Sequence, residues 1–348
     1  MPVLNQENVS ENEKKTVFAK IPNMSSYLVC IVVGDFDFVE RKSIDENVNV
    51  RVYSPVGRKA EALFALDVAV HALDYFSKYL GIDFPLPKMD IVGVRDMGIV
   101  GMENWGLILQ HEAATLFHKS KSSTVTRQRV ATLVIHEIAH QYFGDLTTNW
   151  WTDIWLKEGI AEFFERSLTT ILFPEWKFEL LTLQNTHSNA LFIDSFKSSY
   201  ALKIPYLNQS EMDPVLGNLI YDKGPSLVRM IQKWIGDEAF RKGLNFYLNN
   251  HQYSNAETDD MLDSFDRFSD KNVKNVMNRW FKVEGYPMIK ISQNKKCKKL
   301  SIKQMRFRLN ACENEEEINN EAWKIPVKYI TDANSKTKCI VMKRKIRK

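Results

Sequence analysis

The sequence is poor in the features that mark disulfide-rich, secreted or membrane-spanning proteins. Only four of its 348 residues are cysteine, too few and too scattered for a disulfide framework or a cysteine zinc site. They are Cys30, Cys297, Cys312 and Cys339. No apolar run approaches the roughly 18 residues that span a membrane, and the polar N-terminus lacks the apolar core of a signal peptide. We therefore expect no membrane segment and no route into the secretory pathway, which leaves the native compartment open.

An excess of one charge is also missing from most of the chain. Lys and Arg total 47 against 43 for Asp and Glu, but five of the basic residues fall within 343–348. Without those five, 42 basic residues face 43 acidic ones. A nucleic-acid-binding protein would spread basic residues over a whole face, so we expect no nucleic-acid partner. The basic tail 343–348 is typical of a solvated terminus, with an anion-binding or localisation patch as the alternative.

The rest of the composition, 44% hydrophobic and 26% charged, is that of a globular protein. Strands are predicted in TVFAKI, YLVCIVVGDFDFV and VNVRVYS within 16–53, and in MDIVGV after a helix over 58–81. Apolar residues at helical spacing predict helices over 124–143, 153–172, 222–235, 237–250, 257–267 and 271–282. Strands return in MIKISQ, KLSIKQMRF, WKIPVKYIT and KCIVMKR, and 312–321 is predicted to be a surface loop. This order predicts an α+β fold.

A metal-binding motif, HExxH, lies inside the predicted helix 124–143. His136 and His140 are four residues apart, so both imidazoles can point from one helical face toward a single ion. Glu137 lies about 100° around the helix from His136, close enough to reach a metal-bound water without ligating the metal. The motif predicts a zinc site, and two histidines in the core or on a helix surface are the alternative.

The next predicted helix supplies a third ligand, which catalytic zinc requires beside one open position. Glu158 completes a His, His, Glu set, and Asp153 is a candidate N-cap for the same helix. Glu162 lies one turn further on the same face, where a carboxylate could accept a hydrogen bond from a zinc-binding histidine. A solvated helix glutamate is the alternative for Glu162.

Three segments in order resemble the gluzincin aminopeptidases of the aminopeptidase N type. HEIAHQYFGD followed by WWTDIWLKEGIAEFFE is similar to the zinc signature of that family. VGMENWG at 100–106 resembles its GAMEN exopeptidase motif, and IYDKG at 220–224 its catalytic tyrosine segment. The resemblance runs from about residue 18 to about residue 331.

The resemblance implies a zinc aminopeptidase with one Zn²⁺ per chain. His136, His140 and Glu158 would be the ligands. Glu137 would be the general base toward a zinc-activated water, and Tyr221 the hydroxyl donor to the oxyanion that forms.

The GAMEN-like segment implies that the enzyme removes N-terminal residues. Glu103 would pair with the free α-ammonium group and place the first peptide bond at the zinc. Gly101, Met102 and Asn104 would bind the substrate beside it, and the adaptable methionine suits broad specificity. The implied partners are peptides with a free N-terminus, while the preferred first residue and the oligomeric state are not predicted.

The fold implied by the resemblance is a thermolysin-like, mostly helical catalytic domain over 46–286. The end of an N-terminal β domain would occupy 1–45, a small β-sandwich module 287–342, and the basic tail 343–348. Relative to the family we expect a chain truncated at both ends. Segment 141–157 is one residue shorter than the usual spacing between zinc ligands. Substitutions also occur at three residue pairs: Val100-Gly101, Gln110-His111 and Tyr200-Ala201.

A hypothesis from a different class is a catalytically silent member of the family that binds peptides or has a regulatory role. The truncation and the shortened zinc loop motivate it. An endopeptidase or an epoxide hydrolase on the same scaffold is a weaker alternative, and Glu103 argues against the endopeptidase.

Overall fold

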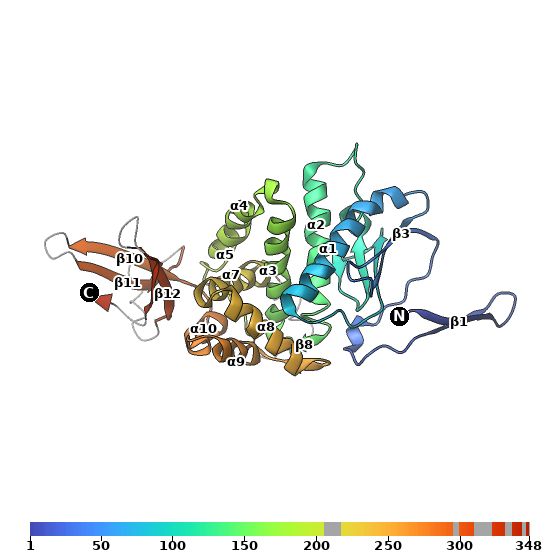
Figure 1. The fold of residues 1–348 in the computed structure, drawn as a ribbon. Coiled ribbons are helices and arrows are strands. Elements are labelled where there is room, and N and C mark those ends of the chain that lie inside the picture. Colours follow the sequence, from blue (N-terminus) through green and yellow to red (C-terminus); the bar gives the residue numbers. More distant parts are fainter. Residues whose placement is uncertain (205–216, 295–298, 310–321, 331–335, 343–345, 348) are drawn as a thin grey trace. The chain divides into compact units, whose positions relative to one another are not determined.

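A computed structural model of the protein describes residues 1–204, 217–294, 299–309, 322–330, 336–342 and 346–347. The chain forms two compact units, and each draws on several stretches of sequence. Figure 1 labels the helices and strands that make them up. The first unit comprises Met1–Trp150, Leu156–Leu180 and Leu244–Ala256, and the second Trp151–Trp155, Leu181–Gly243 and Glu257–Lys348. The predicted domain boundaries at 45, 286 and 342 stay a prediction.

A five-stranded mixed sheet is the framework of the first unit. Its strands are β3 (Phe36–Lys42), β4 (Asn49–Pro55), β5 (Lys88–Val94), β6 (Gly101–Met102) and β7 (Leu107–His111). The order is β3-β4-β5-β7-β6, with β4, β5 and β7 parallel and the two outer strands antiparallel to their neighbours. The apolar run of β5 suits a central parallel strand that is buried on both faces. The short edge strand β6 carries the start of the GAMEN-like segment.

Three long helices pack in or onto this unit. They are α1 (Leu63–Leu80), α2 (Thr124–His140) and α3 (Trp155–Leu172), whose residues from Leu156 onward belong here. Helix α1 contacts β3, β4 and α2, and α2 also contacts β6. Ser123 caps α2 by accepting a hydrogen bond from the Thr126 N–H at 3.1 Å. The last two turns of α2 are buried on every side, so any polar group there needs a partner or a ligand.

Smaller elements lie between and beside these strands and helices in the sequence. They are the antiparallel hairpin β1 (Val3–Asn8) and β2 (Lys14–Phe18), the turns η1 (Ser26–Leu28), η2 (Lys59–Ala62), η3 (Glu112–Ala114), η4 (Trp151–Asp153) and η5 (Pro174–Trp176), helix α4 (Phe178–Thr182), and the parallel pair β8 (Thr147–Asn149) and β9 (Ser254–Ala256).

The predicted strand YLVCIVVGDFDFV is wrong over its first half. The turn η1 takes up its start, no strand is present over 29–35, and β3 begins only at Phe36. Ile31 and Val33 are 81% and 91% exposed. High β-propensity therefore does not make a strand here, because strand formation depends on packing against neighbours and these side chains have little of it.

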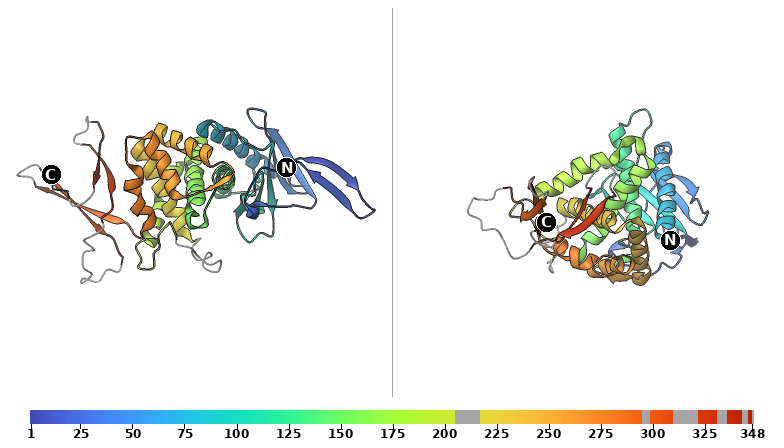
Figure 2. Two further views of the ribbon diagram at one scale, coloured as in Figure 1. Left: turned by 90° about the horizontal axis from the view of Figure 1, so that it is seen from below. Right: turned by 60° about the vertical axis from the view of Figure 1, so that its left-hand side comes forward.

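The second unit is mainly helical and ends in antiparallel strands. Its helical elements are the π-helical turn η6 (Leu183–His187), α5 (Ser188–Ile193), α7 (Asn218–Ile235), α9 (Thr258–Phe268) and α10 (Val273–Lys282), and α8 (Asp237–His251) begins in it. The strands are β10 (Pro287–Asn294), β11 (Lys299–Arg306), β12 (Ile325–Tyr329), β13 (Lys338–Met342) and β14 (Ile346–Arg347) (Figure 2). They form a β10-β11-β14 sheet and a separate β12-β13 pair.

Most predicted helices and the late strands are confirmed within a few residues, and so is the mixed α+β class. Asp153 has a role outside its predicted one: its carboxylate accepts hydrogen bonds from the Thr258 N–H, at 3.1 Å, and from the Thr258 hydroxyl at the start of α9. The predicted loop 312–321 and residues 343–345 and 348 of the tail lie outside the described residues. Among the helices that are described, none combines the length and apolarity needed to cross a bilayer.

Candidate metal centre

The two histidines of the HExxH motif converge at the buried end of α2. His136 and His140 place their rings 4.6 Å apart at 81°, with the two Nε2 atoms 2.9 Å apart. The exposed fractions are 7% and 2%. His140 Nδ1 lies 3.0 Å from the Phe143 carbonyl oxygen, which favours a proton on Nδ1 and leaves Nε2 as the acceptor that faces the site. The i, i+4 spacing therefore brings both rings to one face of the helix, as predicted from the sequence.

Glu158 on α3 completes the set of three donor atoms. Its Oε2 lies 3.6 Å from His136 Nε2 and 3.3 Å from His140 Nε2. Ligands held about 2.0–2.1 Å from a tetrahedral zinc ion are separated by about 3.3 Å. The observed separations of 2.9, 3.3 and 3.6 Å bracket that value. The two imidazoles and the carboxylate thus fit a zinc ion, although segment 141–157 between the ligands is one residue shorter than expected from the resemblance.

Two carboxylates on α3 lie near the ring nitrogen of His136 that points away from the donor set. His136 Nδ1 lies 3.2 Å from Glu165 Oε2 and 3.5 Å from Glu162 Oε1. Glu162 also pairs with Arg166. Burial and then repulsion by Glu165 raise the pKa of Glu162 to about 8. Against the effect of burial, the hydrogen bond to His136 holds the pKa of Glu165 below its usual range. Glu165 is therefore the nearer and more anionic partner of His136, and the sequence pattern alone does not reveal it.

Glu137 lies beside the histidines but makes few contacts of its own. Its Oε2 is buried and finds no hydrogen-bond partner among the described residues. One carboxylate oxygen of Glu137, one of Glu103 and a ring nitrogen of His140 lie within 4.8 Å of one another. Burial raises the pKa of Glu137 to about 7. An unpartnered carboxylate of this kind is suited to exchanging a proton near neutral pH.

The GAMEN-like segment runs along the same helix end. The side chain of Gln141, the residue after His140, donates to the Glu103 carbonyl oxygen at 2.9 Å and accepts from the Gly106 N–H at 2.8 Å. Gly101 packs so closely that a Cβ built on it would lie 2.0 Å from Glu137 Oε1. These contacts fix the distance between the segment and the HExxH helix.

Glu103 is buried within this segment and is already paired. Its Oε1 lies 2.5 Å from Lys157 Nζ and accepts a hydrogen bond from the Tyr27 hydroxyl at 3.2 Å. Although burial opposes ionisation, Lys157 keeps the pKa of Glu103 below its usual range. Lys157 and Tyr27 were not identified from the sequence, although Lys157 directly precedes the zinc-ligand candidate.

The remaining predicted residues are placed as follows. Gly101 and Met102 form β6 and are half-buried. The Asn104 amide donates to the Leu28 carbonyl oxygen at 3.2 Å, which anchors the turn η1 that carries Tyr27. Tyr221 lies in the first turn of α7, in the second unit. Its predicted role stays a prediction.

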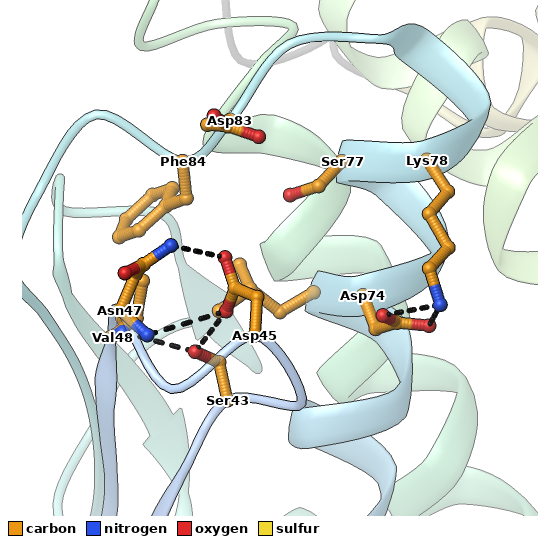
Figure 3. A pocket seen from close by; sticks show the side chains of 10 residues that line it. Ser43, Asp45, Asn47, Val48, Asp74, Ser77, Lys78, Asp83 and Phe84 are labelled. Atoms are coloured by element: carbon orange, nitrogen blue, oxygen red, sulfur yellow. Dashed lines mark hydrogen bonds and ion pairs between the residues drawn. The ribbon is translucent and has the colours of Figure 1, made fainter.

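A cavity of about 160 Å³ elsewhere in the first unit is lined by none of the predicted site residues (Figure 3). The loop before β4 and the C-terminal half of α1 contribute to its lining. Its Asp45 side chain bonds Ser43 and Asn47 within the same loop, and Asp74 pairs with Lys78 at 2.8 Å. Asp45 and Asp74 are thus each paired with side chains close to them in the sequence. The histidine cluster therefore remains the candidate site.

Sequence comparison identifies the family. The Peptidase family M1 domain matches residues 64–280, more than half of the chain. The chain belongs to the peptidase M1 family. The resemblance noted from the motifs is thereby confirmed, and the histidine cluster is a candidate zinc site of an M1 metallo-aminopeptidase family member.

Several aminopeptidases of this family are similar to the chain along much of its length. It is 38% identical over 346 residues to Aminopeptidase M1 of Arabidopsis thaliana, covering 99% of this chain and 38% of that protein. It is 40% identical over 289 residues to "Aminopeptidase 2, mitochondrial" of Saccharomyces cerevisiae, covering 83% of this chain and 30% of that protein. It is 34% identical over 331 residues to the puromycin-sensitive aminopeptidase of Caenorhabditis elegans, and the match covers 94% of this chain and 34% of that protein. The chain spans about a third of the length of these M1 relatives.

Proposed function

We propose that this M1 family member is a zinc-dependent aminopeptidase that hydrolyses the N-terminal peptide bond of peptides with a free N-terminus. The observation that carries the proposal is the convergence of His136, His140 and Glu158 beside a segment that bears Glu103. The three donors fit zinc and would provide the hydrolytic centre. The buried carboxylate of Glu103 near them would select the N-terminal end of a peptide. The relatives named above are all aminopeptidases, which supports the same reaction.

His136 Nε2, His140 Nε2 and Glu158 Oε2 would hold one zinc ion per chain, and Glu165 would hold the His136 ring in place. When bound, zinc lowers the pKa of a coordinated water to about 7 and polarises the substrate carbonyl. Glu137 acts as the general base, because its Oε2 has no competing partner among the described residues and its pKa of about 7 suits proton transfer. The same carboxylate later returns the proton to the leaving amine.

The GAMEN-like segment binds and orients the substrate. Glu103 receives the α-ammonium group of the substrate, and this pairing places the first peptide bond, rather than an internal one, at the reaction centre. Gly101 and Met102 line the site for the first side chain, and Asn104 keeps the segment in position. Tyr221 is proposed as the hydroxyl donor to the oxyanion.

The chain would be divided into domains at the boundaries expected from the resemblance. We propose that residues 46–286 form a thermolysin-like catalytic domain, preceded by the end of an N-terminal β domain. Residues 287–342 would form a β-sandwich module. The strand pairs β10-β11 and β12-β13, which an antiparallel sandwich would contain, support this assignment.

The test is the hydrolysis of an L-aminoacyl 4-nitroanilide and of its N-acetylated counterpart by the zinc-loaded chain. We expect turnover of the free-amine substrate only, and loss of turnover in Glu137→Gln with zinc content unchanged. Equal turnover of the two substrates would contradict the exopeptidase assignment.

The second candidate function is a catalytically silent peptide-binding or regulatory protein, and the pairing of Glu103 with Lys157 is the observation that favours it. A zinc-loaded chain that turns over neither substrate would support this alternative. Turnover abolished by Glu137→Gln would eliminate it.

A further inference from the structure

The carboxylate proposed to receive the substrate's ammonium group is already occupied by an ammonium group of the chain itself. Lys157 Nζ lies 2.5 Å from Glu103 Oε1, and the Tyr27 hydroxyl donates to the same oxygen. Glu103 is 4% exposed and Lys157 9%. A buried pair of this length is a strong, charge-assisted hydrogen bond that water does not screen.

Lys157 has a second carboxylate within reach. Its Nζ lies 3.3 Å from Glu158 Oε1, while the other oxygen of Glu158, Oε2, faces the histidines. The ammonium group also lies 5.1 Å from the centre of the Tyr27 ring, a cation–π contact. Lys157 can therefore release Glu103 and keep a counter-ion, which makes displacement by an incoming cation feasible.

We propose that the Lys157 ammonium group occupies the α-ammonium subsite at Glu103 in the free protein and competes with the N-terminal ammonium group of the substrate. Lys157 thereby sets the affinity for substrates with a free amine. This inference rests on the proposed role of Glu103 as the amine anchor.

The competition has an electrostatic cause. An incoming ammonium group must share Glu103 with a cation that already lies at hydrogen-bonding distance, and two like charges in a buried site repel strongly. Without the lysine charge, Glu103 would be a buried carboxylate lacking its counter-ion. A ligand with an ammonium group would then supply the missing positive charge and bind more tightly.

The experiment compares the wild type with Lys157→Met, which keeps an unbranched side chain one atom shorter and removes the charge. The probe is 3-methylbutan-1-amine, a simple monoamine that is protonated at neutral pH, and the matched neutral probe is 3-methylbutan-1-ol. Affinities for the zinc-loaded full chain are measured by calorimetry, with zinc content and circular dichroism recorded for each variant. This readout needs no turnover.

We expect Lys157→Met to bind the amine at least about tenfold more tightly than the wild type, with unchanged affinity for the alcohol. Adding Glu103→Gln to Lys157→Met should abolish the gain. Lys203→Met is the control for loss of a paired lysine, because Lys203 pairs with Glu257 at 2.8 Å instead of Glu103. It should leave amine affinity as in the wild type. If Lys157→Met does not fold, Lys157→Gln, which retains a hydrogen-bond donor, takes its place.

Equal or weaker amine binding in the Lys157 variants would overturn the inference, and so would a gain that survives Glu103→Gln. The proposed function fails in a different way. If Glu103→Gln alone leaves the amine affinity of the wild type unchanged, Glu103 is not the amine anchor, whatever Lys157 does.

Discussion

Replacing Glu165 by glutamine should weaken zinc binding by about 10- to 100-fold, which corresponds to about 1.4–2.7 kcal/mol. The Oε2 atom of Glu165 lies 3.2 Å from His136 Nδ1, and its side chain is 13% exposed. A carboxylate in that position fixes the ring so that Nε2 faces the metal and makes the imidazole a stronger donor. Glutamine keeps the shape of the side chain and loses the charge.

The assay is zinc affinity measured by competition with a chromophoric chelator at constant pH and salt. Glu162→Gln is the matched control on the same helix. Glu162 lies farther from His136, at 3.5 Å, and pairs with Arg166, so we expect a change of less than about threefold. Unchanged zinc affinity in Glu165→Gln, or an equal loss in Glu162→Gln, would refute the assignment of Glu165 as the partner of His136.

Two further substitutions test the packing around the site and the start of α9. Gly101→Leu adds a side chain larger than the alanine that the GAMEN motif carries at this place. Because even its Cβ would lie 2.0 Å from Glu137 Oε1, it should displace the Glu137 carboxylate and lower kcat by about 100-fold with zinc content unchanged; Gly98→Leu, at a glycine whose added Cβ meets nothing within 4 Å, should not. A Gly101→Leu variant with wild-type kcat would show that the position of Glu137 does not depend on Gly101. Asp153→Ala removes a fully buried carboxylate from the start of α9 and should cost about 3–5 kcal/mol of unfolding free energy in urea. Asp263→Asn, at a 58% exposed carboxylate on α9, should cost less than about 1 kcal/mol, and equal losses would contradict this account.

The parts of the site that could be predicted from the sequence are those set by helix geometry. The spacing of His136 and His140 determines that their rings share a face, whatever the surroundings. Glu158 follows because a zinc site needs a third donor and the next helix offers one. The structure brings these three donors together as predicted, although their roles remain proposals.

Other contacts depend on how separate segments approach each other. The Lys157–Glu103 pair forms because α3 and the segment after β6 meet at the end of α2, and neither residue's spacing reveals it. Glu162 and Glu165 share one side of α3, and only the directions of their side chains show which is nearer to His136. Tyr27 was assigned to a strand, but the hydrogen bond from Asn104 to the turn η1 brings it to Glu103.

The central claim is that His136, His140 and Glu158 form one zinc site, and metal stoichiometry tests it most directly. The purified chain, dialysed against zinc and then against buffer, should retain about one zinc per chain by elemental analysis. His140→Ala should retain none, with its helical circular dichroism preserved. Retention of a full equivalent of zinc by His140→Ala, or of none by the wild type, would contradict the account.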